Sequence, residues 1–217
     1  MNAHITEPKE SRVTVINELI TGPIGSGKTF TVRQRLADEI NAPNTQTWVI
    51  DLYTNLPDWS SKADRYARTP DAARMLLQDA CAEIEDRAAR IAELGLPEFV
   101  AGDEKHGLHL VVITIEETQA VLDDLECVRL VERMVRMGRK VGLKTRMTNT
   151  ARPGPTAFGG SLVIAEQMAA GDVTELPGRS VVGGVTGRGK SRAFDEATAR
   201  LVTGDSAASD SDAKAAT

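Results

Sequence analysis

Apolar residues along the chain follow two spacings, which indicate two kinds of secondary structure. Apolar residues three or four apart predict helices, and short runs rich in Val, Ile and Leu predict strands. Helices are expected at 30–40, 70–94, 118–139 and 162–170, and strands at 13–21, 47–50, 108–115 and 143–150. Residues 180–194 are expected to form a closing hairpin. Because strand and helix signals alternate, the pattern predicts an α/β fold with a mainly parallel sheet flanked by helices and a C-terminal β-hairpin.

The strongest helix signal begins at Thr69, which is expected to cap a helix whose first residue is Pro70. Gly95 is expected to end this helix. Its buried face is predicted to contain Leu77, Cys81, Ile84, Ala88 and Ile91. Its solvated face is predicted to contain Glu83, Asp86, Arg87 and Arg90. The preceding segment, 51–68, is polar and is predicted to be a loop with little regular structure.

The expected strand at 143–150 is unusually polar for its place in the chain. A strand covered on both faces of a parallel sheet should be rich in Val, Ile and Leu, whereas this one contains Lys144 and Arg146. Those two residues share a face in a strand. A solvated face is favoured over a DNA-facing one, so we expect one wet side to this strand or a departure from the regular fold.

Composition and charge limit the class of protein. The chain has 217 residues, of which 41% are hydrophobic and 26% charged, as in a globular domain. We predict a flexible lead-in at 1–12, one domain at 13–203 and a disordered acidic tail at 204–217. No apolar run reaches the ~20 residues of a membrane span and the start is polar, so we expect a cytoplasmic protein without membrane insertion. Cys81 and Cys127 are expected to be reduced and structural.

The formal net charge of −5 gives no global basic signature of a nucleic-acid binder. This does not exclude DNA, because a protein that surrounds a polymer needs positive charge only on the surface that faces it. Arg188, Lys190 and Arg192 lie in the expected hairpin, where an ordinary charged turn is favoured over a phosphate-binding patch.

A phosphate-binding loop is the clearest chemical signal. Residues 22–29 fit the pattern G-x-x-x-x-G-K-[ST], and they lie between an expected strand and an expected helix, as the motif requires. Backbone N–H groups of such a loop surround a phosphate, the lysine reaches the β- and γ-phosphates, and the hydroxyl binds Mg²⁺. The predicted ATP-binding residues are Gly22, Pro23, Ile24, Gly25, Ser26, Gly27, Lys28, Thr29 and Phe30.

Two consecutive acids, Glu116 and Glu117, follow the most apolar expected strand. Such a strand delivers acids to the edge of a parallel sheet where ligands bind, as a Walker B segment does. We predict that Glu116 binds Mg²⁺ together with Thr29, and that Glu117 acts as the catalytic base for the attacking water beside Lys28. Asp51 also follows a strand, and a functional role and a plain loop position remain equally open for it.

Several of these motifs together resemble the motor domain of FtsK/SpoIIIE-type DNA translocases, in particular the short forms encoded by plasmids, integrative elements and phages. The resemblance covers roughly residues 13–200. It rests on the segments 19–29, 48–51, 69–95, 111–117, 138–142, 152–153 and 176–179. It implies a RecA-like P-loop NTPase core that uses ATP and Mg²⁺ to move along double-stranded DNA as a homo-oligomer, with a hexameric ring expected. A membrane protein as a further partner is left open.

The resemblance also implies an arginine supplied by a neighbouring subunit, for which Arg139, Arg152 and Arg179 are candidates. The chain departs from the family pattern at four points. The Walker B aspartate is Glu116, a lysine of the family is replaced by Tyr53, and the sensor glutamine is replaced by Ala151, for which Thr150 or Asn149 could substitute. The fourth departure is that no residues remain for a membrane anchor, an N-terminal subdomain or a winged-helix DNA reader.

Three functions follow from these residues. The leading hypothesis is an ATP hydrolase that translocates double-stranded DNA, for transfer or segregation of a mobile element. An ATP-binding assembly module with little hydrolysis is the first alternative, because the Walker B acid and the sensor residue are altered. A small P-loop kinase is the second, although adjacent acids suit activation of water better than transfer to a small acceptor.

Overall fold

The computed structural model describes residues 15–100, 106–150 and 154–178. The predicted lead-in, the closing hairpin and the acidic tail lie outside the described residues. Among the described helices, none has the combination of length and hydrophobicity that crossing a membrane requires.

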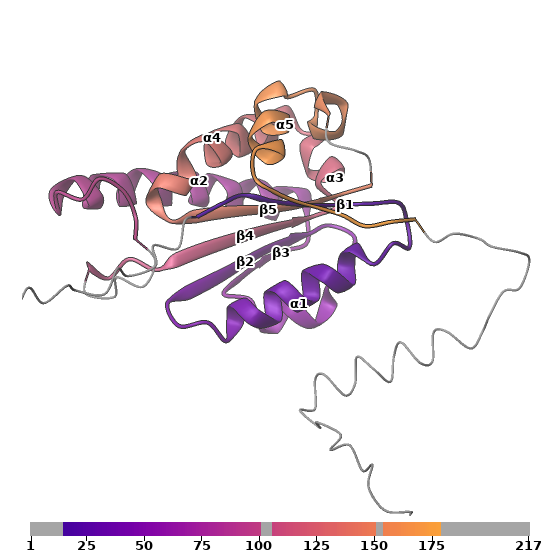
Figure 1. The fold of residues 1–217 in the computed structure, drawn as a ribbon, viewed down its shortest axis with the longest axis horizontal. Coiled ribbons are helices and arrows are strands. Elements are labelled where there is room, and N and C mark those ends of the chain that lie inside the picture. The colour runs from indigo at the N-terminus through magenta and orange to yellow at the C-terminus, as the bar shows by residue number, and fades with distance from the viewer. Residues whose placement is uncertain (1–14, 101–105, 151–153, 179–217) are drawn as a thin grey trace, which may run out of the picture. The chain divides into compact units, whose positions relative to one another are not determined.

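Six parallel strands form one sheet in the order β3-β2-β4-β5-β1-β6 (Figure 1). Their bounds are β1 Glu18–Thr21, β2 Thr45–Asp51, β3 Arg65–Ala67, β4 Leu110–Glu116, β5 Leu143–Asn149 and β6 Asp172–Glu175. The predicted α/β fold with a parallel sheet is therefore confirmed. β5 lies between β1 and β4, so the polar strand pairs with the strand before the phosphate-binding loop on one side and with the strand before the acids on the other.

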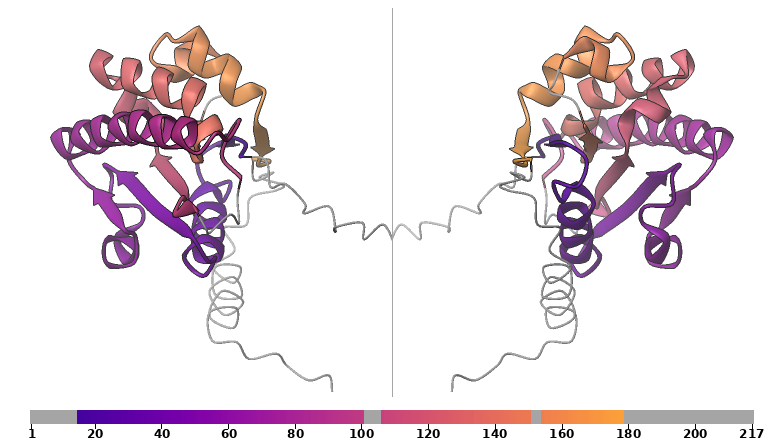
Figure 2. Two further views of the ribbon diagram at one scale, coloured as in Figure 1. Left: turned by 90° about the vertical axis from the view of Figure 1, so that its left-hand side faces the viewer. Right: turned by 90° about the vertical axis from the view of Figure 1, so that its right-hand side faces the viewer.

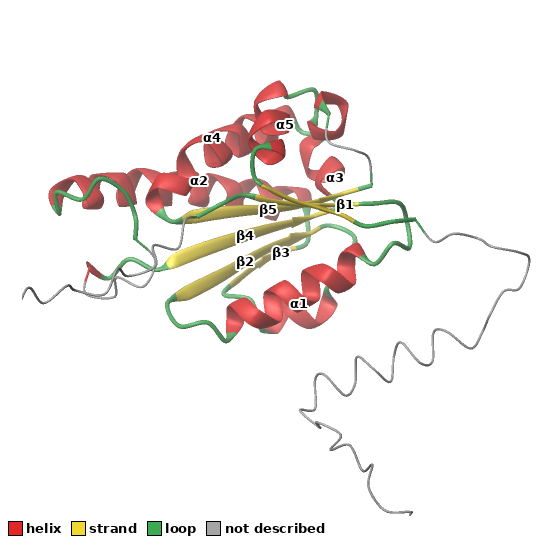
Figure 3. Cartoon of the chain, in the orientation of Figure 1, coloured by secondary structure: helices red, strands yellow, loops and turns green. Residues whose placement is uncertain are grey.

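Helices cover both faces of the sheet, as the side views and the secondary-structure colouring show (Figures 2 and 3). One face carries α1, and the other carries α2, α4 and α5. Their bounds are α1 Lys28–Ile40, α2 Pro70–Glu93, α3 Thr118–Leu122, α4 Leu125–Val141 and α5 Leu162–Ala169, with 3-10 helices η1 at Pro57–Ser61 and η3 at Pro155–Phe158.

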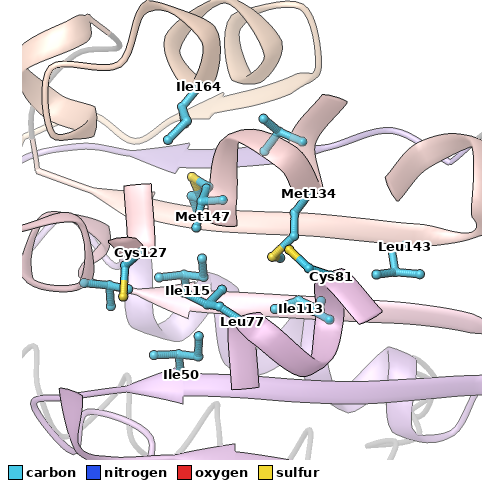
Figure 4. Packing of buried hydrophobic residues seen from close by; sticks show 14 of the residues in the cluster. Ile50, Leu77, Cys81, Ile113, Ile115, Cys127, Met134, Leu143, Met147 and Ile164 are labelled. Carbon is cyan, nitrogen blue, oxygen red and sulfur yellow. The ribbon is translucent and has the colours of Figure 1, made fainter. Parts of the chain in front are cut away.

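The larger hydrophobic core lies between the sheet and the α2, α4 and α5 layer (Figure 4). Alternate residues of β4, such as Ile113 and Ile115, point into it, because successive side chains of a strand face opposite sides. Cys81 of α2 and Cys127 of α4 also lie in this core, and both are free thiols. Burial raises the pKa of the Cys127 thiol to about 11, so it stays protonated at neutral pH. This agrees with the predicted structural role.

Two short strands and one helix break differ from the expectation. β3 and η1 form within the segment 51–68, which was predicted to be irregular, and β6 was not predicted. Both strands lie at an edge of the sheet, where short, half-polar sequences lack a regular apolar pattern. The single helix expected at 118–139 is two helices, because the Asp124 side chain accepts a hydrogen bond from the Glu126 amide and starts α4 afresh.

The predicted solvated face of α2 was wrong at one residue. Arg87 is buried, and its guanidinium donates hydrogen bonds to the carbonyl oxygens of His109 (2.6 Å) and Val141 (3.3 Å). Ala88, predicted to be buried, is exposed. An arginine can bury its apolar stem when the guanidinium finds acceptors, and here it joins α2 to the end of α4 and the residue before β4.

Candidate nucleotide-binding site

The predicted phosphate-binding loop joins the end of β1 to the start of α1, as the motif requires. The Gly22 amide donates to the Asn149 carbonyl (3.2 Å), and the Ser26 amide donates to the Pro23 carbonyl (3.1 Å). Gly27 caps α1 with φ of 101°, a left-handed conformation that an L side chain rarely adopts. The loop therefore presents the N-terminus of α1 at the carboxyl edge of the sheet, where backbone N–H groups attract an anion.

Lys28 is largely buried at the first turn of α1. Its ammonium donates to the Gly22 carbonyl (2.8 Å) and to the Pro23 carbonyl (3.3 Å) of the same loop. The lysine thus curls back over the loop that would receive the phosphates. Ile24 at the tip of the loop is 91% exposed, so the loop is open to solvent beside the lysine.

A close contact at Gly22 fixes the segment that follows β6. A Cβ atom at Gly22 would lie 2.6 Å from the Leu176 carbonyl oxygen and 2.7 Å from the Ser26 hydroxyl oxygen. The Leu176 amide in turn donates to the Thr21 carbonyl (2.7 Å), which extends the β1–β6 pairing to the loop. Only glycine fits here, because φ is +156° and backbone occupies the space of a side chain.

The two predicted metal-binding residues meet. The Thr29 hydroxyl of α1 donates to Glu116 Oε1 at the end of β4 (2.8 Å). The other oxygen, Glu116 Oε2, accepts from the Thr148 hydroxyl of β5 (2.8 Å). Thr148 Oγ1 accepts in turn from the Glu117 amide (2.8 Å). A continuous path of hydrogen bonds therefore joins α1, the end of β4 and β5.

Burial raises the pKa of Glu116, and the neighbouring carboxylates of Glu117 and Asp51 add to the increase. Hydrogen bonds from Thr148 and Thr29 act in the opposite direction, because they stabilise the ionised carboxylate. Glu116 is 1% exposed, so its charge depends on these two hydroxyls and on any cation that binds beside it.

Glu117 leaves the strand in an unusual conformation. Its φ of 51° and ψ of 61° are left-handed, and it caps the N-terminus of the short helix α3. A non-glycine residue there carries backbone strain of about 1–3 kcal/mol, which surrounding contacts must hold in place. The hydrogen bond from its amide to Thr148 is such a contact. Glu117 is half-buried, whereas Glu116 is buried.

The donor set at this edge suits Mg²⁺. Mg²⁺ is usually bound by one or two protein oxygens and by phosphate and water oxygens, and Thr29 and Glu116 supply a hydroxyl and a carboxylate in direct contact. Among the described residues, no group of three or more His, Cys, Asp or Glu side chains forms a metal site. The residues present therefore fit a metal that the protein and a triphosphate bind together.

Asp51 supports a loop. Its carboxylate accepts hydrogen bonds from the amides of Asn55 (2.9 Å) and Leu56 (2.7 Å) and from the Tyr66 hydroxyl (2.8 Å). The side chain is fully buried. These bonds close the turn after β2 and leave Tyr53 exposed at its tip. The burial of Tyr66 and its bond to Asp51 raise the pKa of the phenol, so Tyr66 remains a donor to Asp51.

The predicted solvated face of β5 was wrong at Arg146, which is fully buried. Arg146 Nε donates to Glu18 Oε2 (2.8 Å), and Nη1 donates to Glu39 Oε2 of α1 (2.9 Å). Lys144, which is 23% exposed, pairs with Glu18 (2.8 Å), and Arg35 of α1 pairs with Glu18 (3.2 Å). We call these five residues the Arg146 cluster.

The Arg146 cluster fastens the second half of α1 to the sheet, while the first turn of the same helix carries Lys28 and Thr29. Burial alone would raise the pKa of Glu18, but the Arg146 charge and the hydrogen bond from Lys144 outweigh it and lower that pKa. The polar composition of the strand was the signal for this cluster. It did not reveal that the acidic partners lie on β1 and α1.

The other predicted residues are placed in part. Arg139 is exposed near the end of α4, and α4 leads directly into the start of β5, so this arginine lies at the edge of the sheet opposite the loop. The side-chain amide of Asn149 donates a hydrogen bond to the backbone carbonyl of Ala157 (2.8 Å). Ala151, Arg152 and Arg179 lie outside the described residues. Thr148, which contacts both acids, was not predicted as a site residue.

These features define the fold: the chain has the α/β fold of P-loop ATPases, and the residues predicted as the phosphate-binding loop and the Walker B acid lie at one edge of the sheet, where Thr29 and Glu116 are hydrogen-bonded. By sequence, no protein-family model and no curated protein matches the chain.

Three solved structures illustrate the shared fold. The pCW3 conjugation coupling protein TcpA, solved as a monomer with ATPgS, has a TM-score of 0.57 and 18% identity over 75% of this chain and 53% of that one. ATPases 2 and 3 of EssC from Geobacillus thermodenitrificans have a TM-score of 0.60 and 17% identity over 70% and 30%. The cytoplasmic domain of EssC has a TM-score of 0.62 and 16% identity, over 79% of this chain and 37% of that one. The chain thus spans about half or less of each neighbour, and such identities show a shared fold.

Proposed function

We propose that the protein is an ATP-hydrolysing motor of the FtsK/SpoIIIE type that translocates double-stranded DNA. The observation that carries this proposal is the 2.8 Å contact between the Thr29 hydroxyl and Glu116, because it brings together a lysine-bearing loop and a doublet of acids that are 87 residues apart in the chain. Both are the groups that phosphoryl chemistry on a nucleoside triphosphate uses.

Each group has a role in this proposal. The loop N–H groups and the Lys28 ammonium bind and neutralise the β- and γ-phosphates, after the ammonium leaves the carbonyls of Gly22 and Pro23. Thr29 and Glu116 hold Mg²⁺, which supplies charge neutralisation on the phosphate oxygens when bound. Glu117 orients a water molecule and accepts its proton. Thr148 positions both acids without touching the nucleotide.

The proposed partners are double-stranded DNA and further copies of the same chain in a hexameric ring. Support comes from the motif resemblance and from the fold shared with the conjugation coupling protein TcpA and with the EssC ATPases. In a ring, an arginine from the neighbouring subunit would complete the site, and Arg139 is the described candidate. The exposed position of Arg139, away from its own loop, suits a residue that acts on another subunit.

ATP turnover with and without duplex DNA tests the proposal. We expect stimulation by duplex DNA, loss of turnover in Lys28→Ala, and ATP binding without turnover in Glu117→Gln. Thr29→Ala should also lose Mg²⁺-dependent turnover, whereas Thr31→Ala is the matched control, because the Thr31 hydroxyl donates to the Gly27 carbonyl and not to Glu116. Turnover that is indifferent to Lys28→Ala and Glu117→Gln would refute the proposal.

An ATP-binding assembly module with little hydrolysis is a second candidate, which a different observation favours. Glu116 replaces the shorter aspartate, is buried, and has a raised pKa, and a protonated carboxyl is a poor metal ligand. Tight ATP binding, ATP-dependent sedimentation as an oligomer and turnover no faster than the spontaneous rate would together favour this candidate. In that case Glu116→Asp should raise turnover.

A further inference from the structure

One surface of α4 carries a row of four cations, flanked by Glu126, which pairs with Arg74, and by Glu132, which accepts a hydrogen bond from Ser161. Arg129, Arg133, Arg136 and Lys140 are spaced four, three and four residues apart, which places them on one face of a helix. All four are exposed, and the opposite face of α4 is buried against the sheet. We call them the α4 stripe. At 1.5 Å per residue the stripe is about 16 Å long. It lies on the layer of helices opposite α1 and so is separate from the candidate nucleotide site.

The charge of the stripe is largely uncompensated. Arg133 pairs with Glu85 of α2, but Arg129, Arg136 and Lys140 form no ion pair with the described residues. The acids on the neighbouring helix surface are mostly paired with other arginines. These pairs are Asp79 with Arg65, Glu83 with Arg87, Glu93 with Arg90, and both Asp124 and Glu126 with Arg74. A local excess of positive charge therefore stands on a chain whose net charge is −5.

The fold alone does not account for this arrangement. Cations in the last turn of a helix interact favourably with its dipole, which explains Lys140 and the neighbouring Arg139. Arg129 and Arg133 lie in the first half of α4, where the dipole does not favour them. Like charges four residues apart on a helix repel each other, so the pair destabilises the helix that carries it. Glu85 offsets this repulsion at Arg133, and an anionic partner would offset it at the other cations of the stripe.

We propose that the α4 stripe binds the phosphate backbone of duplex DNA; this inference rests on the proposed DNA-translocating function. Phosphates of one DNA strand follow each other every 3.4 Å along the duplex axis, so a stripe of about 16 Å faces several of them. Three of the four residues are arginines, whose planar guanidinium groups bind phosphate oxygens in pairs. The contact is independent of base sequence, as a translocating motor requires.

Charge and composition favour DNA over an acidic protein. Protein interfaces have an apolar centre surrounded by a polar rim, whereas the stripe has cations at its centre and exposed apolar residues at its margins, Leu125 one turn before Arg129 and Met137 beside Arg136. Phosphates repeat with constant charge along the duplex, which matches a row of four cations of one sign.

Salt-dependent DNA binding of the full chain tests the stripe. The variant Arg129→Gln/Arg136→Gln/Lys140→Gln removes three charges, and Lys62→Gln/Arg68→Gln/Arg90→Gln removes three charges from other exposed positions. Binding to a 30-base-pair duplex is measured by fluorescence anisotropy over a KCl series. Each lost phosphate contact should reduce the slope of log K against log[salt] by about 0.9. We expect a reduction of nearly three in the stripe variant, little change in the control, and unchanged ATP turnover without DNA.

The outcomes separate the stripe from the proposed function. Equal slopes for the wild type and the stripe variant, with both folded by circular dichroism, overturn the stripe and leave the motor proposal standing. Lys28-dependent ATP turnover without any duplex binding overturns both the stripe and DNA as the partner. Binding of polyglutamate that competes with DNA and is lost in the stripe variant overturns the DNA assignment in favour of an acidic protein. A smaller slope of log K against log[salt] in the stripe variant, with an unchanged slope in the control variant, supports the proposal.

Discussion

Replacing Arg146 by methionine tests whether the Arg146 cluster holds α1, the helix that follows the predicted phosphate-binding loop, on the sheet. The guanidinium is fully buried and contacts Glu18, Glu39 and the Thr114 hydroxyl. Methionine resembles the apolar stem of arginine but lacks the guanidinium, so the substitution leaves Glu39 without its buried partner and Glu18 with Lys144 and Arg35. We expect the substitution to lower the free energy of unfolding of the domain while its secondary structure content stays nearly unchanged.

The magnitude follows from burial. Removing one partner of a buried ion pair costs about 3–5 kcal/mol, because the other charge remains buried and uncompensated. Glu18 keeps two cations, so the lower value, about 3 kcal/mol, is expected here. That is a large share of the roughly 5–15 kcal/mol that stabilises a typical domain. For a domain of this size it lowers the midpoint of thermal unfolding by about 6–12 °C.

The pH dependence gives a second, independent measure. The pKa of Glu18 is lowered from 4.5 by the cluster, so its stabilising contribution is fully present above pH 4.5 and disappears as the pH falls through the lowered value. The difference in the free energy of unfolding between wild type and Arg146→Met should therefore be largest near pH 7. It should shrink as the pH falls below about 4.

Urea unfolding at pH 7 and at about pH 3, below the ordinary carboxylate range, followed by circular dichroism, is the assay. Lys144→Met is the matched control: it removes a cation that pairs with the same Glu18 oxygen but is 23% exposed, so its loss should cost about 1 kcal/mol or less. If Arg146→Met costs no more than Lys144→Met, or if its cost does not depend on pH, the cluster does not hold α1 in the way described.

Three further changes test the site itself. Thr148→Val removes the hydroxyl that bonds Glu116 and Glu117. We expect the activation barrier to rise by about 2 kcal/mol, which lowers kcat roughly thirtyfold at a similar KM for ATP. Thr148→Ser should restore kcat. Gly22→Ala should destabilise the chain by about 1–3 kcal/mol and weaken ATP binding, because its Cβ would meet Leu176; unchanged nucleotide titration would contradict the loop geometry. Glu116→Gln should lose turnover yet be more stable than wild type at pH 8. The folded-state pKa of Glu116 is raised, so its stabilising contribution is full below its unfolded pKa and is lost as pH rises. The difference in the free energy of unfolding between Glu116→Gln and wild type should therefore close at pH 4. Urea unfolding at pH 4 and pH 8 measures it.

Local signals in the sequence were sufficient for the parts of the site that are local in the chain. The loop at 22–29, the cap at Thr69 and the apolar strand before Glu116 each depend on a few neighbouring residues, and all three lie where they were expected. The contact of Thr29 with Glu116 was expected because strands of a parallel sheet end at the same edge.

Features that depend on which strands are neighbours could not be predicted. The position of β5 between β1 and β4 is a matter of topology, and a polar strand has no pattern that reveals its partners.

Arg87 was assigned to the wrong face because its acceptors, the His109 and Val141 carbonyls, lie on other elements. A helical period tells which residues share a face, but it does not tell whether a long cation will find buried acceptors there.

The polarity of β5 connects these observations. An apolar strand in this central position would strengthen the core, yet this strand carries Arg146 and Thr148 on the face that carries α1. Arg146 bonds the second half of α1, and Thr148 bonds the acid that contacts Thr29 in its first turn. Side chains of one strand are therefore linked to both halves of α1, directly through Arg146 and by way of Glu116 through Thr148. β5 thus contributes Leu143 and Met147 to the core and, through its buried polar side chains, links α1 to Glu116.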